Sequence, residues 1–338
     1  MKTLLKLAVL ALASTAALAF AGNALAVQRL SVSQSATSLT IKVTQAQTDP
    51  QPAKIQIVVP TGYTLNTSAA PGTKIGTTSG NVVARDAGNI TLPLTGDVVV
   101  APPNTNAPGC TTGTHLAVWV LDLQVAGQHI QLPVAVDATS GATAAVGAYQ
   151  LVTCLGPADV PQGTPGRSPQ GAQLLEATFT VNNVFQVPAL LSTWKAFTTP
   201  YTPNTGVPNI AGTVETRALV GSGALTLNPR VVSKKKRVLR LSGRLTQAGA
   251  AVTGAQVRLL LNGKASKFTA RTTPTGSFSV VLRKTGRRST TTFQGRVTVP
   301  ERDVTSTACQ GPTLPSVTCV SATASGFTAL SRRIRVRL

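Results

Sequence analysis

Few residues in this chain have the chemistry for catalysis. The 338-residue sequence has two histidines, His115 and His129, and one short stretch holds both of them together with Asp122 and Asp137. Imidazole and carboxylate groups are the usual general acids and bases of enzymes. A hydrolase would also need a nucleophile or an activated water, and the sequence has no G-x-S-x-G elbow, H-E-x-x-H pair, P-loop or dinucleotide fingerprint. We therefore expect a non-enzymatic protein with no catalytic residues, no cofactor and no metal ligands.

One alternative stays open, an extracellular hydrolase or carbohydrate-binding protein that uses the first part of the chain. The eight acidic residues between positions 27 and 230 are scattered, and a paired-carboxylate glycosidase needs no fixed sequence spacing. Aromatic platforms for sugars are few, with two tryptophans and three tyrosines in the whole chain.

The cysteines indicate disulfides rather than a metal site. The gaps between Cys110, Cys154, Cys309 and Cys319 are 43, 154 and 9 residues, whereas a four-thiolate zinc site has pairs only two to four residues apart. An even number of cysteines is typical of exported proteins. Of the three possible pairings, proximity favours Cys110–Cys154 and Cys309–Cys319.

The amino terminus has the pattern of a cleaved signal peptide. Lys2 and Lys6 precede an apolar run over residues 7–20, and Ala24 and Ala26 supply small residues before a cleavage site. A second site at residues 19–21 competes with it. No later stretch approaches the roughly 20 apolar residues of a membrane helix. We expect residues 1–26 to be removed and the protein to be secreted, extracellular or associated with the cell envelope, without a membrane span.

Charge divides the remaining chain into two parts. Residues 27–230 hold 9 basic and 8 acidic residues, whereas residues 231–338 hold 20 basic and 2 acidic ones. No acidic residue occurs between Glu215 and Glu301. Such asymmetry is typical of a domain boundary. We expect one domain over residues 27–230 and a second, basic domain over residues 231–338.

Composition and periodicity predict an all-β protein. Thr, Val, Gly, Pro and Ser are abundant, and short alternating stretches are separated by turn residues, as in β-sandwiches. The clearest hairpin runs over residues 115–125 and 128–136 around a turn at residues 126–127, with Trp119, Leu121 and Leu123 on one face. We expect two β-sandwich (Ig-like) domains in tandem after the signal peptide.

A glycine and valine pattern in the second domain supports this assignment. It reads Gly243, Leu245, Gly249, Val252, Gly254-Ala255, Val257, Leu259, Thr273, Gly276 and Phe278. The pattern resembles bacterial Ig-like and carboxypeptidase-regulatory-like (transthyretin-type) modules of secreted and surface proteins, over about 45 of the 108 residues. The resemblance implies a small sandwich in which a tight glycine turn precedes an aromatic core residue. The first domain resembles no family that we recognise.

Alternation within the basic domain places its charges on strand faces that point to solvent. Apolar residues occupy one parity of each stretch and arginines the other, as in the terminal run Ile334 to Arg337. We expect this surface to attach electrostatically to an anionic cell-envelope polymer or polysaccharide. Sequence-specific nucleic-acid binding is not expected, because this half has no Trp or Tyr to stack on bases. The alternative is that the charge only keeps the sandwich soluble. The candidate polyanion-binding residues are Lys234, Lys235, Lys236, Arg237, Arg258, Arg283, Arg296, Arg333, Arg335 and Arg337.

Overall fold

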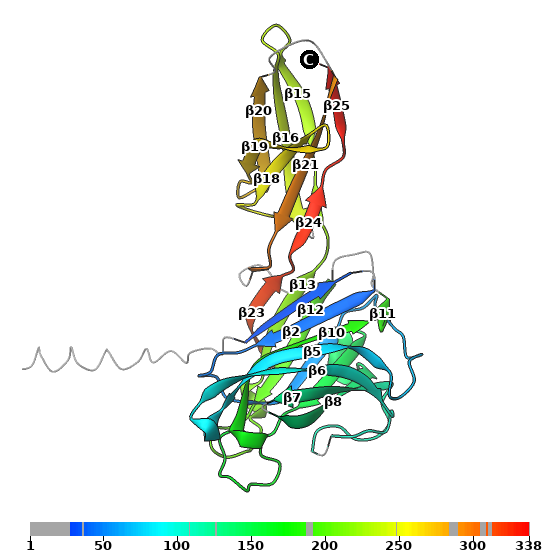
Figure 1. Cartoon of the computed structure of the whole chain (residues 1–338), viewed down its shortest axis with the longest axis vertical. Coiled ribbons are helices and arrows are strands. Elements are labelled where there is room, and N and C mark those ends of the chain that lie inside the picture. The colour runs from blue at the N-terminus through cyan, green and yellow to red at the C-terminus, as the bar shows by residue number, and fades with distance from the viewer. Residues whose placement is uncertain are drawn as a thin grey trace, which may run out of the picture.

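A computed structural model confirms the all-β class, with short 3-10 turns as its only other regular elements in the described part of the chain (Figure 1). The described residues are 28–35, 37–107, 109–125, 127–186, 192–247, 249–283, 290–304, 309 and 313–337. The predicted signal peptide lies outside them. Within these ranges no helix has the length and apolar character needed to cross a membrane.

The larger part of the molecule is built on one 13-stranded sheet. Neighbouring strands pair antiparallel except for the parallel pair β13 and β23. In sheet order the strands are β1 (Arg29–Gln34), β2 (Ser38–Thr44), β10 (Ala172–Asn182), β5 (Lys74–Ala84), β6 (Ile90–Ala101), β7 (Ala117–Val125), β8 (Gln128–Ala138), β9 (Tyr149–Cys154), β3 (Pro52–Val59), β12 (Ser192–Pro200), β13 (Val214–Val220), β23 (Thr318–Ala324) and β22 (Arg302–Asp303).

Several short elements accompany the large sheet. One of them is a two-stranded ribbon in which Phe185 pairs with Leu65. The ribbon strands are β4 (Thr64–Leu65) and β11 (Phe185–Gln186), and the 3-10 turns are η1 (Arg85–Ala87), η2 (Gly141–Ala145), η3 (Pro169–Gly171) and η4 (Ile210–Gly212).

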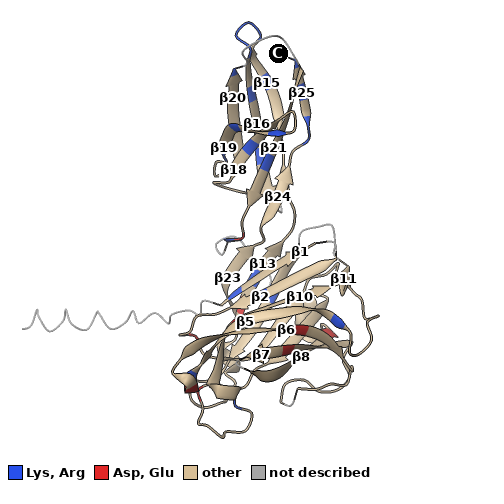
Figure 2. Ribbon diagram, in the orientation of Figure 1, with Lys and Arg blue, Asp and Glu red and all other residues tan. Residues whose placement is uncertain are grey.

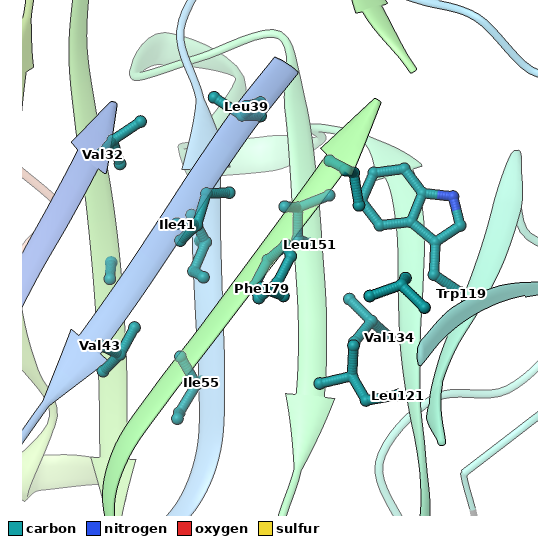
Figure 3. Packing of buried hydrophobic residues seen from close by; sticks show 14 of the residues in the cluster. Val32, Leu39, Ile41, Val43, Ile55, Trp119, Leu121, Val134, Leu151 and Phe179 are labelled. Carbon is teal, nitrogen blue, oxygen red and sulfur yellow. The ribbon is translucent and has the colours of Figure 1, made fainter. Parts of the chain in front are cut away.

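The large sheet folds over on itself and encloses a hydrophobic core. Its first strand, β1, packs against β13 and β23, where the Thr323 hydroxyl donates a hydrogen bond of 2.6 Å to the Leu30 carbonyl. Ile41 and Phe179 from one layer lie among Ile55 and Leu151 from the other (Figure 3). Alternation along each strand delivers these side chains to one face, and their burial is the main stabilising contribution to the layer packing.

The predicted hairpin is confirmed as β7 and β8, whose register pairs Val125 with Gln128 next to the turn. Trp119, Leu121 and Leu123 are buried on the core face, as expected.

A second unit, here called the distal module, projects from one end of the large sheet (Figure 1). Its first sheet joins β16 to β14, β15, β17 and β20, and its second has the order β19-β18-β21-β24 with β25 also paired to β21. The strands are β14 (Gly223–Leu225), β15 (Asn228–Ser233), β16 (Val238–Gln247), β17 (Ala250–Ala251), β18 (Gln256–Leu261), β19 (Lys264–Arg271), β20 (Ser277–Arg283), β21 (Thr290–Val299), β24 (Phe327–Leu330) and β25 (Ile334–Arg337).

The two sheets of the distal module enclose their own core. Leu241, Val257, Leu259, Phe278 and Val297 are among its buried residues, at the parity that the alternation predicts. The turn between β18 and β19 is the two-residue Asn262-Gly263, and both residues have positive φ, as a type I′ hairpin requires.

Strand pairing differs from the predicted boundary at residue 231. β14 and β15 begin before that residue, yet both pair with β16 of the distal module. In the opposite sense, β22 and β23 follow the boundary but join the large sheet, where β23 pairs along β13. The chain thus leaves the distal module after β21, adds two strands to the large sheet, and returns as β24. A boundary drawn from charge alone misses this excursion because it follows composition and not backbone pairing.

Candidate polyanion-binding surface

Arginines occur along the strands of both sheets of the distal module (Figure 2). On the second sheet, Arg258 of β18 lies directly opposite Arg296 of β21. On the first sheet, Arg230 of β15 lies directly opposite Arg240 of β16. All four residues are exposed, and for Arg240, Arg258 and Arg296 the alternation that buries their neighbours turns them to solvent.

The run of four basic residues, Lys234 to Arg237, forms the turn between β15 and β16. A boundary at residue 231 places this run at the entrance to the basic domain, but the turn lies at the end farthest from the large sheet (Figure 2). The reason is that β15 already belongs to the distal module and runs its full length before the turn. Register brings further charge to this tip, since Arg283 pairs with Val238 and Arg337 with Thr290.

Of the remaining candidates, Arg333 and Arg335 are also exposed and flank the start of β25. The ten candidate residues therefore do not form a single patch. Lys234, Lys235, Lys236, Arg237, Arg283 and Arg337 gather at the tip, and Arg258, Arg296, Arg333 and Arg335 lie over the second sheet.

No carboxylate side chain accompanies these cations on the module itself, since the sequence has no acid between Glu215 and Glu301. Glu301 and Asp303 lie where the chain rejoins the large sheet, and they interact with Ser31 and Arg29 of β1. Like charges directly opposite across strands destabilise a sheet. The two arginine pairs therefore create positive potential that only a counter-ion or an anionic ligand can neutralise.

On the large sheet, by contrast, several basic side chains have acidic partners. Exposed Lys42 and Lys74 pair with Glu176 and Asp97 at 2.8 and 2.7 Å. Arg167 donates two hydrogen bonds to Asp86, which hold the pKa of Asp86 below its ordinary value.

A buried charged cluster on the large sheet was not predicted. Glu215 is 0 % exposed; it lies 3.3 Å from the Lys195 ammonium and accepts hydrogen bonds from Arg217 and from the Thr313 hydroxyl. Burial lowers the pKa of Lys195. Glu215 and Arg217 are two residues apart on one strand and so share a face. This spacing is the one feature of the sequence from which the pairing of the two charges could have been predicted.

The two histidines do not form a joint site. His115, with its side chain 5 % exposed, contacts Asp137 at 2.8 Å through Nδ1, whereas His129, with its side chain 56 % exposed, lies 3.0 Å from Asp122. His129 pairs with Gln124 near the turn, and His115 precedes the other end of the hairpin. Although one short stretch of sequence holds both histidines, the antiparallel register places the two imidazoles at opposite ends of the hairpin. Within the described residues, no group of three or more His, Cys, Asp or Glu side chains could hold a metal ion.

A broad groove of about 1490 Å³ lies over β3, β9 and β12 of the large sheet. Phe197, Tyr201 and Gln56 are among its lining residues, and neither histidine is. The Tyr201 hydroxyl donates a hydrogen bond of 2.7 Å to the Leu155 carbonyl, and burial raises the pKa of this phenol.

Both disulfides have the pairing that proximity favoured, Cys110–Cys154 and Cys309–Cys319. The first lies at the groove and the second closes the segment that contains Thr313. Two disulfides are typical of extracellular or surface proteins, because reducing compartments keep thiols free.

Comparisons with known proteins identify no family. No protein-family model matches the chain, and no curated protein matches its sequence. Among solved structures, a protein of Corynebacterium diphtheriae, provisionally named as membrane-anchored, matches with a TM-score of 0.20 and 10% identity, over 80% of this chain and 48% of that one. The chain thus spans about half of its length. A TM-score of 0.20 does not establish a shared fold, and the resemblance of residues 243–278 to Ig-like modules stays a prediction.

Proposed function

We propose that this is a non-enzymatic extracellular or surface protein whose distal module attaches electrostatically to an anionic polymer, such as a cell-envelope polymer or acidic polysaccharide. The observation that carries the proposal is the contrast in charge pairing. Several lysines and arginines of the large-sheet unit have a carboxylate partner, at Glu176, Asp97, Asp86 or Glu215, whereas the sequence places no acid between β14 and the end of β21.

Solubility alone would not require this arrangement. A soluble surface is served by mixed charges, whereas directly opposed arginines destabilise the sheet that carries them. The tip adds four consecutive basic residues in a turn, where flexible side chains reach a polymer from several directions. A polymer with repeated anionic groups gains from such an array through counter-ion release and Coulomb attraction.

The test is binding of the purified full-length protein to polyanionic beads and to isolated cell envelopes across a salt series. We expect retention at about 50 mM salt and release at several hundred mM, because exposed charges are screened over roughly 10 Å at 0.1 M. A variant with Lys234, Lys235, Lys236 and Arg237 all replaced by Gln should elute at lower salt. If the wild-type protein shows no salt-sensitive retention on any polyanion, the proposal fails.

A carbohydrate-binding or hydrolytic role of the large sheet is the second candidate, and the groove beside Tyr201 favours it. Substitution of Gln56 and Tyr201 by Ala would then weaken binding to neutral glycans and leave binding to polyanions unchanged. Unaltered glycan-array profiles for this variant would remove the candidate.

A further inference from the structure

The second sheet of the distal module carries a shallow groove of about 420 Å³ on its outer face. It lies over the middle of β21, between β18 on one side and β25 on the other. This volume is within the roughly 300–1,000 Å³ typical of small-ligand sites. The lining residues are Leu260, Asn262, Gly263, Thr292, Gln294 and Arg333.

Side chains that form hydrogen bonds make the floor, and the backbone holds them in place. Asn262 and Thr292 are joined by two hydrogen bonds, from the Asn262 amide to the Thr292 carbonyl (2.8 Å) and from the Thr292 amide to the Asn262 side chain (2.9 Å). The Gln294 side-chain amide donates to the Ser331 carbonyl at 2.9 Å. Between Leu260 and Arg333, the floor therefore consists of ordered, uncharged polar residues on paired strands.

Guanidinium groups border this floor. Thr292, Gln294 and Arg296 alternate along β21 and so share the outer face. Gln294 is paired with Leu260, and the next pair on the same face is Arg296 with Arg258. Across the groove, Arg335 is paired with Thr292. A ligand lying along β21 would meet arginines at one end and on one side, with amide and hydroxyl groups between them.

We propose that this groove binds a segment of an acidic polysaccharide, with its charged groups on Arg333, which lines the groove, and on Arg258, Arg296 and Arg335 at its border, and with its hydroxyls on Thr292 and Gln294. This inference rests on the proposed function and narrows it to one face and one polymer class. Guanidinium groups pair with carboxylates or sulfates in two-point hydrogen bonds. The uncharged floor matches sugar hydroxyls, for which a polyphosphate has no equivalent.

The opposite face of the module provides a matched control. There Arg230 and Arg240 form the same kind of cross-strand pair, and Arg240 is next to Val281, which is 54 % exposed. Removing two charges from either face changes the net charge equally. Only the removal of Arg258 and Arg296 takes away charges that border the groove.

The experiment measures affinity of the full-length protein for polygalacturonate, polyphosphate and dextran at fixed ionic strength. The variant Arg258→Gln/Arg296→Gln should lose about tenfold or more in affinity for polygalacturonate, as expected for two charge-assisted hydrogen-bonding groups. The variant Arg230→Gln/Arg240→Gln should lose no more than roughly threefold, the effect of general screening. Polyphosphate affinity should fall equally in both variants, and dextran should not bind.

A charge-neutral variant separates hydrogen bonding from charge. Thr292→Val should weaken polygalacturonate binding and leave polyphosphate binding unchanged, with an unaltered melting temperature as the check on folding. Equal losses of polygalacturonate affinity on the two faces would overturn the groove and leave the proposed function standing. Absence of wild-type binding to both charged polymers would overturn both.

Discussion

The hydroxyl of Thr313 donates a hydrogen bond to the carboxylate of Glu215, although 98 residues separate them in sequence. Glu215 belongs to β13 of the large sheet, and Thr313 lies in the excursion that the chain makes after β21. A segment that follows most of the distal module thus completes a charged cluster in the other unit.

Replacement of Glu215 by Gln should lower the free energy of unfolding by about 3 kcal/mol or more, because it leaves Lys195 and Arg217 buried without their shared carboxylate. Chemical denaturation of the purified variant measures this. Asp97→Asn is the matched control, since it breaks the exposed pair with Lys74 and should cost less than about 1 kcal/mol. Similar costs for the two variants would mean that the cluster contributes no more than a surface ion pair.

Acid should abolish the contribution of Asp86. Hydrogen bonds from Arg167 hold its pKa below the ordinary value of 3.8, so the carboxylate favours the folded state above that pH. The advantage is lost as pH falls through the folded-state pKa. Asp86→Asn should therefore melt at a lower temperature than wild type at pH 7, and the difference should shrink progressively as pH falls below 3.8. A difference that stays constant over this range would contradict the assignment.

Arg296→Glu should stabilise the distal module while weakening polyanion binding. The new carboxylate lies opposite Arg258 and replaces a repulsive cross-strand pair with an attractive one, a gain of up to about 1 kcal/mol. Arg271→Glu makes the same change in net charge on the same sheet, but Arg271 is paired with Gln256. Its melting temperature should stay closer to wild type, and thermal unfolding of both variants distinguishes the cases.

Removal of each disulfide by Cys→Ser pairs should destabilise to different extents. The cross-links Cys110–Cys154 and Cys309–Cys319 span 44 and 10 positions. Loop entropy then predicts losses of roughly 4 and 3 kcal/mol. The shorter loop also contains Thr313. The stability lost on removing Cys309–Cys319 should therefore exceed the entropic value when Glu215 is present, and it should approach the entropic value in the Glu215→Gln background. Additive effects in this double-mutant cycle would show that the loop does not support the cluster.

Local chemistry was sufficient to predict several parts of this molecule. Period-two alternation placed Val257, Leu259 and Phe278 in a core, and the turn at residues 126–127 located a hairpin. Short separations along the chain identified both disulfides. These features depend on neighbours in sequence or on parity within one strand.

Features that depend on long-range pairing were not accessible in the same way. Nothing in the sequence around Thr318 indicates that β23 lies beside β13, because two parallel strands need no turn between them and their pairing leaves no local sequence signal. The position of Lys234 to Arg237 at the tip follows from β15 belonging to the distal module, which charge does not reveal. The groove over β21 could be predicted only with the knowledge that β18 and β25 both pair with β21.

The excursion through β22 and β23 also determines how the two units share load. The chain crosses between them three times, after β13, after β21 and after β23. At the first crossing the fit is close, since a Cβ on Gly223 would lie 1.7 Å from the Phe327 ring. A pull applied at the tip is therefore divided among three covalent segments, two of which leave from β13 and β23, strands that pair with each other in the large sheet. Three crossings restrain the module, whereas a single flexible linker would let it swing freely.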